Sequence, residues 1–343
     1  MNEDLSLDWK ELGFAYHKTD YNLRCTFSSG EWGEIEVHTD ETLNLHMAAG
    51  CLHYGQQAFE GQKAFMGKDG KVRLFRIDDN ARRMQNSARG IKMEPIPLEL
   101  FREMAIKAVQ LNARFIPPYG SDASLYLRPL EVGTTPLVGV RPADDFLFVL
   151  FTTPVGAYFK DGFKPTKVVV YREFDRAAPL GTGCWKVGGN YACGMRATTK
   201  AKENGFSAAL FLDPKEKRYI DECGPANFFG IRDGAYITPK SGSILPSITN
   251  MSLQQIARDM GLRVECRPVE LEELATFEEA AECGTAAVAT PLSEVYDEAN
   301  DRSYCFASNG QPGPVTTELY RRLRGIQLGE LPDTYGWTTV VDI

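Results

Sequence analysis

GCWKVGGNYACG, residues 183–194, contains one strong base, Lys186, among four glycines, a tryptophan and a tyrosine. Gly188 and Gly189 allow the backbone to approach a bulky ligand closely, because glycine has no side chain. The stretch therefore leaves two interpretations: a surface lysine in a flexible turn, or a lysine placed for chemistry.

Three neighbours favour a chemical role for Lys186. Trp185, Val187 and Tyr191 can form a partly dry pocket, and burial lowers the pKa of a lysine and makes it nucleophilic. A nucleophilic lysine typically forms a Schiff base with a carbonyl group, and pyridoxal phosphate (PLP) is the cofactor most commonly used in this way. A nucleotide loop is disfavoured, because GTGCWK (181–186) lacks the third glycine of a dinucleotide loop and the chain has no GxxxxGK[ST] motif.

Length and charge exclude several other classes of protein. The chain has 343 residues, which suits two domains, and a formal net charge of −8. An acidic chain without a basic run is a poor nucleic-acid binder. No apolar run approaches the roughly 20 residues of a membrane span, and the acidic start MNEDLSLDWKEL lacks the apolar core of a signal peptide.

The histidines and cysteines narrow the chemistry further. The four histidines all lie at or before His53, so a histidine-based triad or zinc site would have few candidates, and we expect no metal. The eight cysteines are scattered without CxxC spacing, which indicates reduced thiols in a cytoplasmic protein.

The order of periodic segments predicts an α/β protein of the α+β type with two domains. In the first half, residues 72–77, 124–133 and 146–154 are typical of strands, and residues 78–90 and 98–115 of helices. Two prolines and two glycines in residues 154–165 predict a linker. We therefore expect a smaller N-terminal domain at 1–153 and a larger C-terminal domain at 166–343.

The second half of the chain combines antiparallel strand connections with crossover connections. Predicted strands are 166–173, 207–213, 218–222, 262–270 and 285–292; predicted helices are 190–204, 247–261 and 270–280; residues 228–239 form a hairpin. The turn of the hairpin is Asp233-Gly234, and Thr249 is a plausible N-cap of the second helix. This mixture of antiparallel and crossover connections disfavours a doubly wound sheet.

KVGGNY (186–191) resembles the lysine motif of branched-chain amino acid aminotransferases, which are PLP enzymes of fold type IV. Seven further segments are similar to the family in the same order. They are LHYGQQAFEGQKAF (52–65), VRLFRIDDNARRM (72–84), SLYLRP (124–129), PVGAYF (154–159), YIDECGPANFF (219–229), LPSIT (245–249) and GTAAVATP (284–291). The resemblance covers roughly residues 12 to 330 and implies mixed sheets, flanking helices and a barrel-like larger domain.

The resemblance implies which residues hold the cofactor. Lys186 matches the Schiff-base lysine, and Glu222 matches the glutamate that meets the pyridine nitrogen. Tyr191 matches the tyrosine that hydrogen-bonds the ring hydroxyl. Arg76 matches the phosphate-binding arginine, whose planar fork suits phosphate oxygens.

Three further positions are implied for the phosphate. Ile248 and Thr249 open a helix, where free amides and the dipole favour an anion. Thr285 is similar to the remaining phosphate contact of the family. From the residues alone, Glu222 is more readily a solvated acid, Arg76 a surface cation and Tyr191 a core residue.

The resemblance also implies a substrate pocket built largely by the first domain. Tyr54 and Phe59 would provide an apolar wall for leucine, isoleucine and valine, and Tyr126 would line the pocket. Arg128 would accept the distal carboxylate of glutamate. The amides of Thr285 and Ala286 would hold the substrate's α-carboxylate; in the family the region of Tyr54 reaches the neighbouring subunit's site, which implies a homodimer.

Other functions stay open at this point. Within fold type IV, D-amino acid aminotransferases, (R)-amine aminotransferases and aminodeoxychorismate lyases share a similar lysine and glutamate. A non-enzymatic PLP carrier and a structural protein with a fortuitous glycine loop are the alternatives outside enzymes. YLRP together with FEGQKAF favours the branched-chain type, with 2-oxoglutarate as the amino acceptor.

Overall fold

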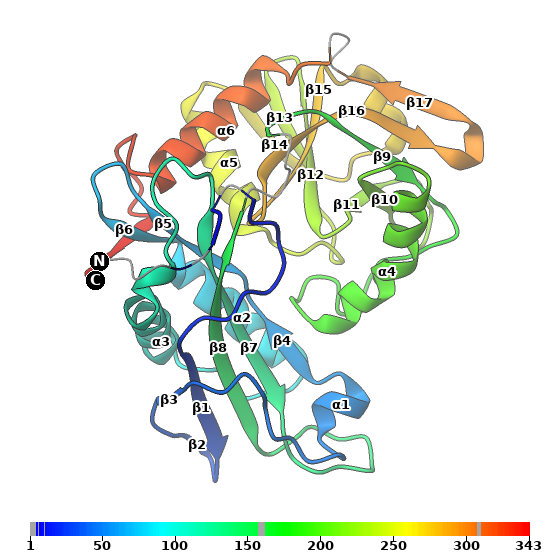
Figure 1. Cartoon of the computed structure of the whole chain (residues 1–343). Coiled ribbons are helices and arrows are strands. Elements are labelled where there is room, and N and C mark those ends of the chain that lie inside the picture. Colours follow the sequence, from blue (N-terminus) through cyan, green and yellow to red (C-terminus); the bar gives the residue numbers. More distant parts are fainter. Residues whose placement is uncertain (1–4, 6, 10, 157–161, 307–309) are drawn as a thin grey trace. The chain divides into compact units, whose positions relative to one another are not determined.

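The computed structural model describes residues 5, 7–9, 11–156, 162–306 and 310–343 (Figure 1). The chain divides into two compact units. Unit 1 comprises Met1–Tyr158, Trp185–Gly188 and Gly325–Ile343, and unit 2 comprises Phe159–Cys184 and Gly189–Arg324. The predicted domains 1–153 and 166–343 stay a prediction, and residues 157–161 of the predicted linker 154–165 lie outside the described residues.

Unit 1 is built on one antiparallel sheet. Its strands are β1 (Asn22–Ser28), β2 (Glu31–Trp32), β3 (Glu36–His38), β4 (Gln57–Phe59), β5 (Gln62–Met66), β6 (Val72–Phe75), β7 (Ser124–Gly133), β8 (Phe146–Val155) and β18 (Thr338–Val341). The hydrogen-bonded order is β18-β6-β5-β7-β8-β1-β2, with β3 paired to β1 and β4 to β7. The C-terminal strand β18 thus completes an edge of the sheet beside β6.

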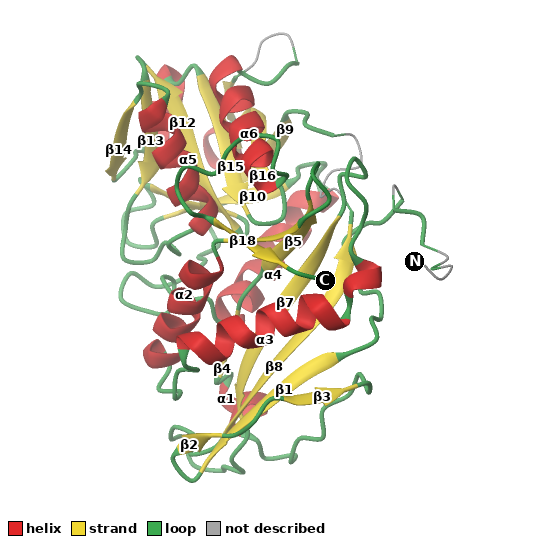
Figure 2. Ribbon diagram, turned by 90° about the vertical axis from the view of Figure 1, so that its left-hand side faces the viewer, coloured by secondary structure: helices red, strands yellow, loops and turns green. Residues whose placement is uncertain are grey.

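Two helices cover one face of this sheet. They are α2 (Ile77–Gly90) and α3 (Leu98–Leu111), and Figure 2 shows α3 crossing β7 and β8 with α2 beside it. Leu125 and Leu127 on β7 are fully buried, as are Met84 on α2 and Phe101 on α3. Each such side chain contributes about 1.5–3 kcal/mol on burial. The short helix α1 (Gly50–Tyr54) and the 3-10 helix η1 (Ala113–Phe115) complete the unit.

Unit 2 contains a closed barrel. In it, β11 (Ile220–Cys223), β10 (Ala208–Leu212), β9 (Thr166–Val170), β16 (Val288–Asp297), β15 (Glu279–Gly284) and β12 (Ala226–Arg232) follow one another, and β12 pairs again with β11. β13 (Ala235–Pro239), β14 (Arg263–Arg267) and β17 (Arg302–Cys305) extend the sheet. Buried side chains such as Val168, Leu210 and Phe228 form the core.

The helices of unit 2 begin with α4 (Gly188–Glu203), which follows the glycine loop. α5 (Ile248–Asp259) links β13 to β14, η2 (Leu271–Thr276) precedes β15, and η3 (Glu298–Asn300) follows β16. α6 (Pro314–Gln327) begins in unit 2 and ends in unit 1. The mixed sheets, flanking helices and barrel confirm the predicted fold class.

Three local predictions were wrong. The predicted helix 270–280 is present only as a 3-10 helix at Leu271–Thr276, because from Glu279 the chain forms the buried strand β15, which pairs with β12 and β16. The strand expected from Thr285 begins at Val288, since residues 285–287 form a turn. The N-cap of α5 is Ser247 rather than Thr249: Ser247 has an extended backbone and its hydroxyl accepts the Asn250 N–H.

Within the residues that the structure describes, no helix combines the length and apolar character that crossing a membrane requires. All eight cysteines are free thiols, as the sequence predicts. No group of three or more acidic, cysteine or histidine side chains suited to a metal occurs in this described part of the chain.

Candidate functional site

The backbone of Lys186 is fixed by its neighbours in unit 1. Its N–H donates to the hydroxyl of Ser87 on α2 at 2.9 Å. Its carbonyl accepts the N–H of Phe59, at the end of β4, at 3.1 Å, and the next residue, Val187, forms a β-bridge with Ala58. Lys186 therefore extends the edge of β4 as an added strand residue.

The amine of Lys186 has the properties expected of a nucleophile. Its Nζ lies 4.7 Å from the centre of the Phe59 ring. Burial, together with the Arg83 and Arg128 cations, lowers the pKa of the amine from 10.5 to about 8, although Glu60 and Tyr126 act in the opposite direction. At this pKa about a tenth of the amine is neutral at pH 7. The expected lowering is present, and burial is its main cause.

Two of the predicted substrate residues lie on β7, close to Phe59. The guanidinium of Arg128 is 5.0 Å from the centre of the Phe59 ring and donates to the Tyr126 hydroxyl at 3.3 Å. Gly61 leaves room for that tyrosine, because a side chain at this position would overlap the Tyr126 hydroxyl. Unit 1 thus brings an apolar ring, a phenol and a guanidinium close to the Lys186 amine.

Arg76 is held in a restricted conformation at the start of α2. Its φ of 50° places it in the left-handed region, where residues other than glycine are uncommon. Its Nε pairs with Asp79 at 2.7 Å, and its guanidinium stacks on the Trp337 ring at 5.1 Å. Its N–H donates to the Trp337 carbonyl at 2.6 Å. Such a conformation, maintained by several contacts, is typical of functional positions.

Tyr54 lies at the C-terminal end of α1 and is exposed. Its hydroxyl donates to the carbonyl of Val138, in the loop between β7 and β8. Within unit 1, Phe59, Tyr126, Arg128 and Lys186 are connected by these contacts, whereas Tyr54 is tied to a different loop.

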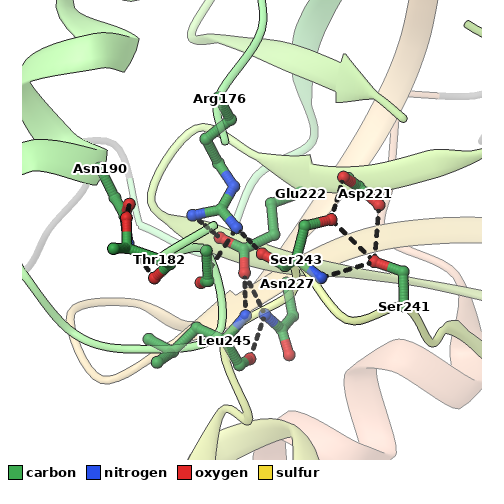
Figure 3. A network of polar contacts seen from close by, with 10 residues as sticks. Arg176, Thr182, Asn190, Asp221, Glu222, Asn227, Ser241, Ser243 and Leu245 are labelled. Atoms are coloured by element: carbon green, nitrogen blue, oxygen red, sulfur yellow. Dashed lines mark hydrogen bonds and ion pairs between the residues drawn. The ribbon is translucent and has the colours of Figure 1, made fainter. Parts of the chain in front are cut away.

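In unit 2, Glu222 is anchored by a buried polar network (Figure 3). The side chain lies on β11 and is 3% exposed. One carboxylate oxygen accepts the N–H of Leu245 at 2.6 Å and the side-chain amide of Asn227 at 3.4 Å, and the other lies 3.6 Å from the Arg176 guanidinium. A cation and two hydrogen-bond donors thus surround this buried carboxylate.

Arg176 connects this network to the glycine loop. Its guanidinium donates to the carbonyls of Gly183 and Ser243. Gly183 has no room for a side chain, because a Cβ would overlap the Ser243 backbone. Asp221 points to the other side of β11, where it accepts the hydroxyls of Ser241 and Ser243 (Figure 3).

Tyr191 lies in the first turn of α4 and is half-buried. The start of this helix is held by Asn190, which donates to the Thr182 carbonyl at 2.8 Å and accepts the Thr182 hydroxyl at 2.6 Å (Figure 3). These hydrogen bonds hold the end of the glycine loop, directly before Tyr191.

The remaining predicted phosphate and carboxylate contacts lie at two backbone features. Ile248 and Thr249 are buried in the first turn of α5, where helix amides face the N-terminus. Thr285 and Ala286 form the turn between β15 and β16. Val288, which ends this turn, has a φ of 65°, an unusual conformation for a β-branched residue.

The chain matches a family model described as amino-transferase class IV over residues 57–295. It is 46% identical to the branched-chain-amino-acid aminotransferase of Haemophilus influenzae, over 98% of this chain and 99% of that protein. The chain belongs to the class IV aminotransferase family.

Solved structures agree with this assignment. The Escherichia coli branched-chain amino acid aminotransferase aligns with a TM-score of 0.80 and 25% identity, covering 95% of this chain and 100% of that one. A second branched-chain amino acid aminotransferase, solved in complex with N-(5'-phosphopyridoxyl)-L-glutamate, aligns with a TM-score of 0.76 and 26% identity, covering 95% and 99%. This class IV aminotransferase is therefore a PLP-dependent enzyme.

The side chains of this aminotransferase fit PLP chemically. An amine with a pKa of about 8 suits condensation with an aldehyde, and a carboxylate held by Arg176 suits a protonated pyridine nitrogen. A preorganised guanidinium at Arg76 suits a phosphate. These assignments of individual residues stay proposals.

The sequence alone did not identify the residues that hold Lys186, Glu222 and Arg76 in place. Arg176 and Asn227 hold Glu222, Trp337 holds Arg76, and Glu60 and Arg83 surround Lys186 electrostatically. Glu60, Arg83 and Asn227 fall inside the segments that resemble the family, but nothing in their local spacing shows which partner each one meets.

Proposed function

We propose that this aminotransferase transfers the amino group of L-leucine, L-isoleucine or L-valine to 2-oxoglutarate, giving branched-chain 2-oxo acids and L-glutamate. The support is twofold: relatives of this chain named branched-chain-amino-acid aminotransferases are 46% and 44% identical over nearly its whole length, and the described site has suitable chemistry.

One observation carries the proposal. Phe59 contacts both the Lys186 amine and the Arg128 guanidinium, with ring-centre distances of 4.7 and 5.0 Å. An aminotransferase of this type must accept an apolar side chain in one half-reaction and an acidic side chain in the other. An aromatic ring and a cation beside the reacting amine meet both requirements.

Each residue has a proposed task. Bound PLP supplies an electron sink that acidifies the Cα proton of the amino acid. Lys186 accepts that proton with its amine and returns it to the cofactor, a transfer that typically contributes about 10²–10⁴-fold in rate. Glu222 keeps the pyridine nitrogen protonated, and Tyr191 donates to the ring hydroxyl.

The remaining side chains bind and orient. Arg76, with the amides near Ile248, Thr249 and Thr285, holds the phosphate. The amides of Thr285 and Ala286 hold the α-carboxylate. Tyr126 orients Arg128, which receives the distal carboxylate of glutamate.

A homodimer is part of the proposal. Near Tyr54, unit 1 exposes Met47, Leu52, Val138 and Val140, with exposures of 83%, 59%, 90% and 85%. Clustered exposed apolar side chains mark interaction surfaces. Tyr54 bonds the Val138 carbonyl, so this surface would carry Tyr54 into an interface. A cytoplasmic location is also proposed, from the free thiols.

The test is the visible absorption spectrum of the purified, PLP-loaded protein before and after addition of L-leucine. We expect a yellow band that L-leucine bleaches and 2-oxoglutarate restores. Lys186→Ala should lose the band's bleaching and the turnover. A band that only D-leucine or an (R)-amine bleaches would assign the enzyme to another branch of fold type IV, and near-normal turnover of Lys186→Ala would refute the role of that lysine.

A further inference from the structure

A buried ion pair lies beside the Lys186 amine in unit 1. The Arg83 guanidinium donates to both oxygens of the Glu60 carboxylate, at 2.7 and 2.8 Å. The Glu60 side chain is 0% exposed and that of Arg83 is 11% exposed. A two-pronged contact of this kind fixes the orientation of both side chains.

The same elements hold the backbone of Lys186. Ser87 lies one turn after Arg83 on α2, donates to the Arg83 carbonyl at 3.0 Å, and accepts the Lys186 N–H at 2.9 Å. Glu60 directly follows Phe59, whose N–H bonds the Lys186 carbonyl. The ion pair therefore joins α2 to the end of β4 at the two points from which Lys186 is held.

We propose that Glu60 and Arg83 are positioning residues for Lys186, which lock α2 to β4 around the lysine and balance the charge next to its amine. This inference rests on the proposed function only in assigning the reaction to Lys186. It adds two residues whose contacts with each other hold the elements around Lys186.

The charges around the amine support a balancing role. In unit 1 the groups that act on it are Arg83 on α2, Glu60 after β4, and Tyr126 and Arg128 on β7. Arg83 lowers the pKa of the amine and Glu60 raises it. The two charges act in opposite directions, so removing either one leaves the effect of the other on the lysine unopposed by its ion-pair partner.

The experiment measures the pKa of Lys186 in the full-length chain freed of cofactor. The probe is acetic anhydride, applied at a series of pH values, with acetylation of the Lys186 peptide quantified by mass spectrometry. Glu60→Gln should lower the pKa by about one unit, and Arg83→Gln should raise it by about one unit. Arg89→Gln, an exposed arginine on the same helix, is the matched control and should leave it unchanged.

Opposite shifts distinguish this proposal from a merely structural role. Loosened packing would move the pKa in the same direction in both variants, and that result would overturn the proposal, as would two shifts no larger than that of Arg89→Gln. If a single variant fails to fold, Arg83→Lys keeps the cation: a pKa close to wild type supports the charge role, and a shift of about one unit overturns it.

A separate experiment tests whether Lys186 is the reacting lysine of the proposed function. Borohydride reduction of the PLP-loaded wild-type protein should leave a pyridoxyl group on Lys186. Its absence would refute the assignment of the reaction to this lysine, whereas the acetylation profile of the cofactor-free chain would still report on Glu60 and Arg83.

Discussion

Arg176 shows how one buried side chain can hold a carboxylate that we propose to be functional. It is 8% exposed, pairs with Glu222 at 3.6 Å, and is held by the carbonyls of Gly183 and Ser243. The same arginine thereby ties the glycine loop to the carboxylate proposed for the pyridine nitrogen.

At the residue scale, we predict that Arg176→Met destabilises the protein by about 3 kcal/mol, because it leaves the Glu222 carboxylate buried without its cation. Urea unfolding of the cofactor-free protein measures the change. Arg302→Met, which removes an exposed arginine paired with Glu272, is the control and should cost less than about 1 kcal/mol. Equal stabilities of the two variants would contradict the importance of the buried pair.

The residues also show what a sequence can predict of such a site. Lys186 stands out because glycines and aromatic residues surround it within the same twelve positions. Its electrostatic partners do not: Glu60 and Arg83 are about a hundred residues away, and the pairing arises only when α2 packs beside β4. The sequence around Lys186 is enough to identify the nucleophile. Its pKa can be explained only from the folded structure, because the charged partners are distant in the sequence.

At the scale of elements, α5 provides a sharper test. The sequence places a helix at 247–261, and the structure has it at Ile248–Asp259. Its apolar periodicity predicts the helix, but Ser247 and Thr249 are both capping residue types. Only the backbone geometry distinguishes them, since Ser247 has φ −75° and ψ 124° and its hydroxyl meets the Asn250 N–H at 3.2 Å.

We therefore predict that Ser247→Ala lowers the free energy of unfolding by about 1 kcal/mol, the usual cost of a lost cap. Urea unfolding of the cofactor-free protein measures it. Ser247→Asp keeps an acceptor for the same N–H and should stay close to wild type. If both variants lose the same stability, the hydrogen bond is not what this serine contributes.

The predicted helix at 270–280 failed for a reason that belongs to the same scale. Residues 270–276 have strong helix formers and a capping box between Glu270 and Glu273. From Glu279 the chain enters the barrel, where β15 pairs with both β12 and β16. Tertiary pairing thus overrides a local preference, which a sequence window cannot detect.

At the scale of the whole molecule, buried ionisable groups make stability depend on pH. Glu282 lies on β15 in the barrel of unit 2 and is 7% exposed. Burial raises the pKa of its carboxyl from 4.5 to about 7, with a hydrogen bond to Cys223 opposing the rise. The folded state therefore keeps this proton over a range of pH where the unfolded chain has already lost it.

The sign follows from proton linkage. Between pH 4.5 and about 7 the folded state binds more protons than the unfolded state, so this carboxyl makes the protein less stable as the pH rises through that window. Lys186 acts in the opposite sense at higher pH: its pKa is lowered to about 8, so stability increases from about pH 8 towards 10.5. The two windows do not overlap, and each can be examined separately.

We predict that Glu282→Gln removes the loss in the lower window, which amounts to about 3 kcal/mol for a shift from 4.5 to about 7. Urea unfolding of wild type and variant at pH 5, 6, 7 and 8 measures the difference, which should grow in favour of the variant as the pH rises and level off above pH 7. Glu203→Gln, at the exposed end of α4, should give a difference that is constant with pH. A constant difference for Glu282→Gln as well would contradict this prediction, because it would show that folding does not raise the pKa of this carboxyl.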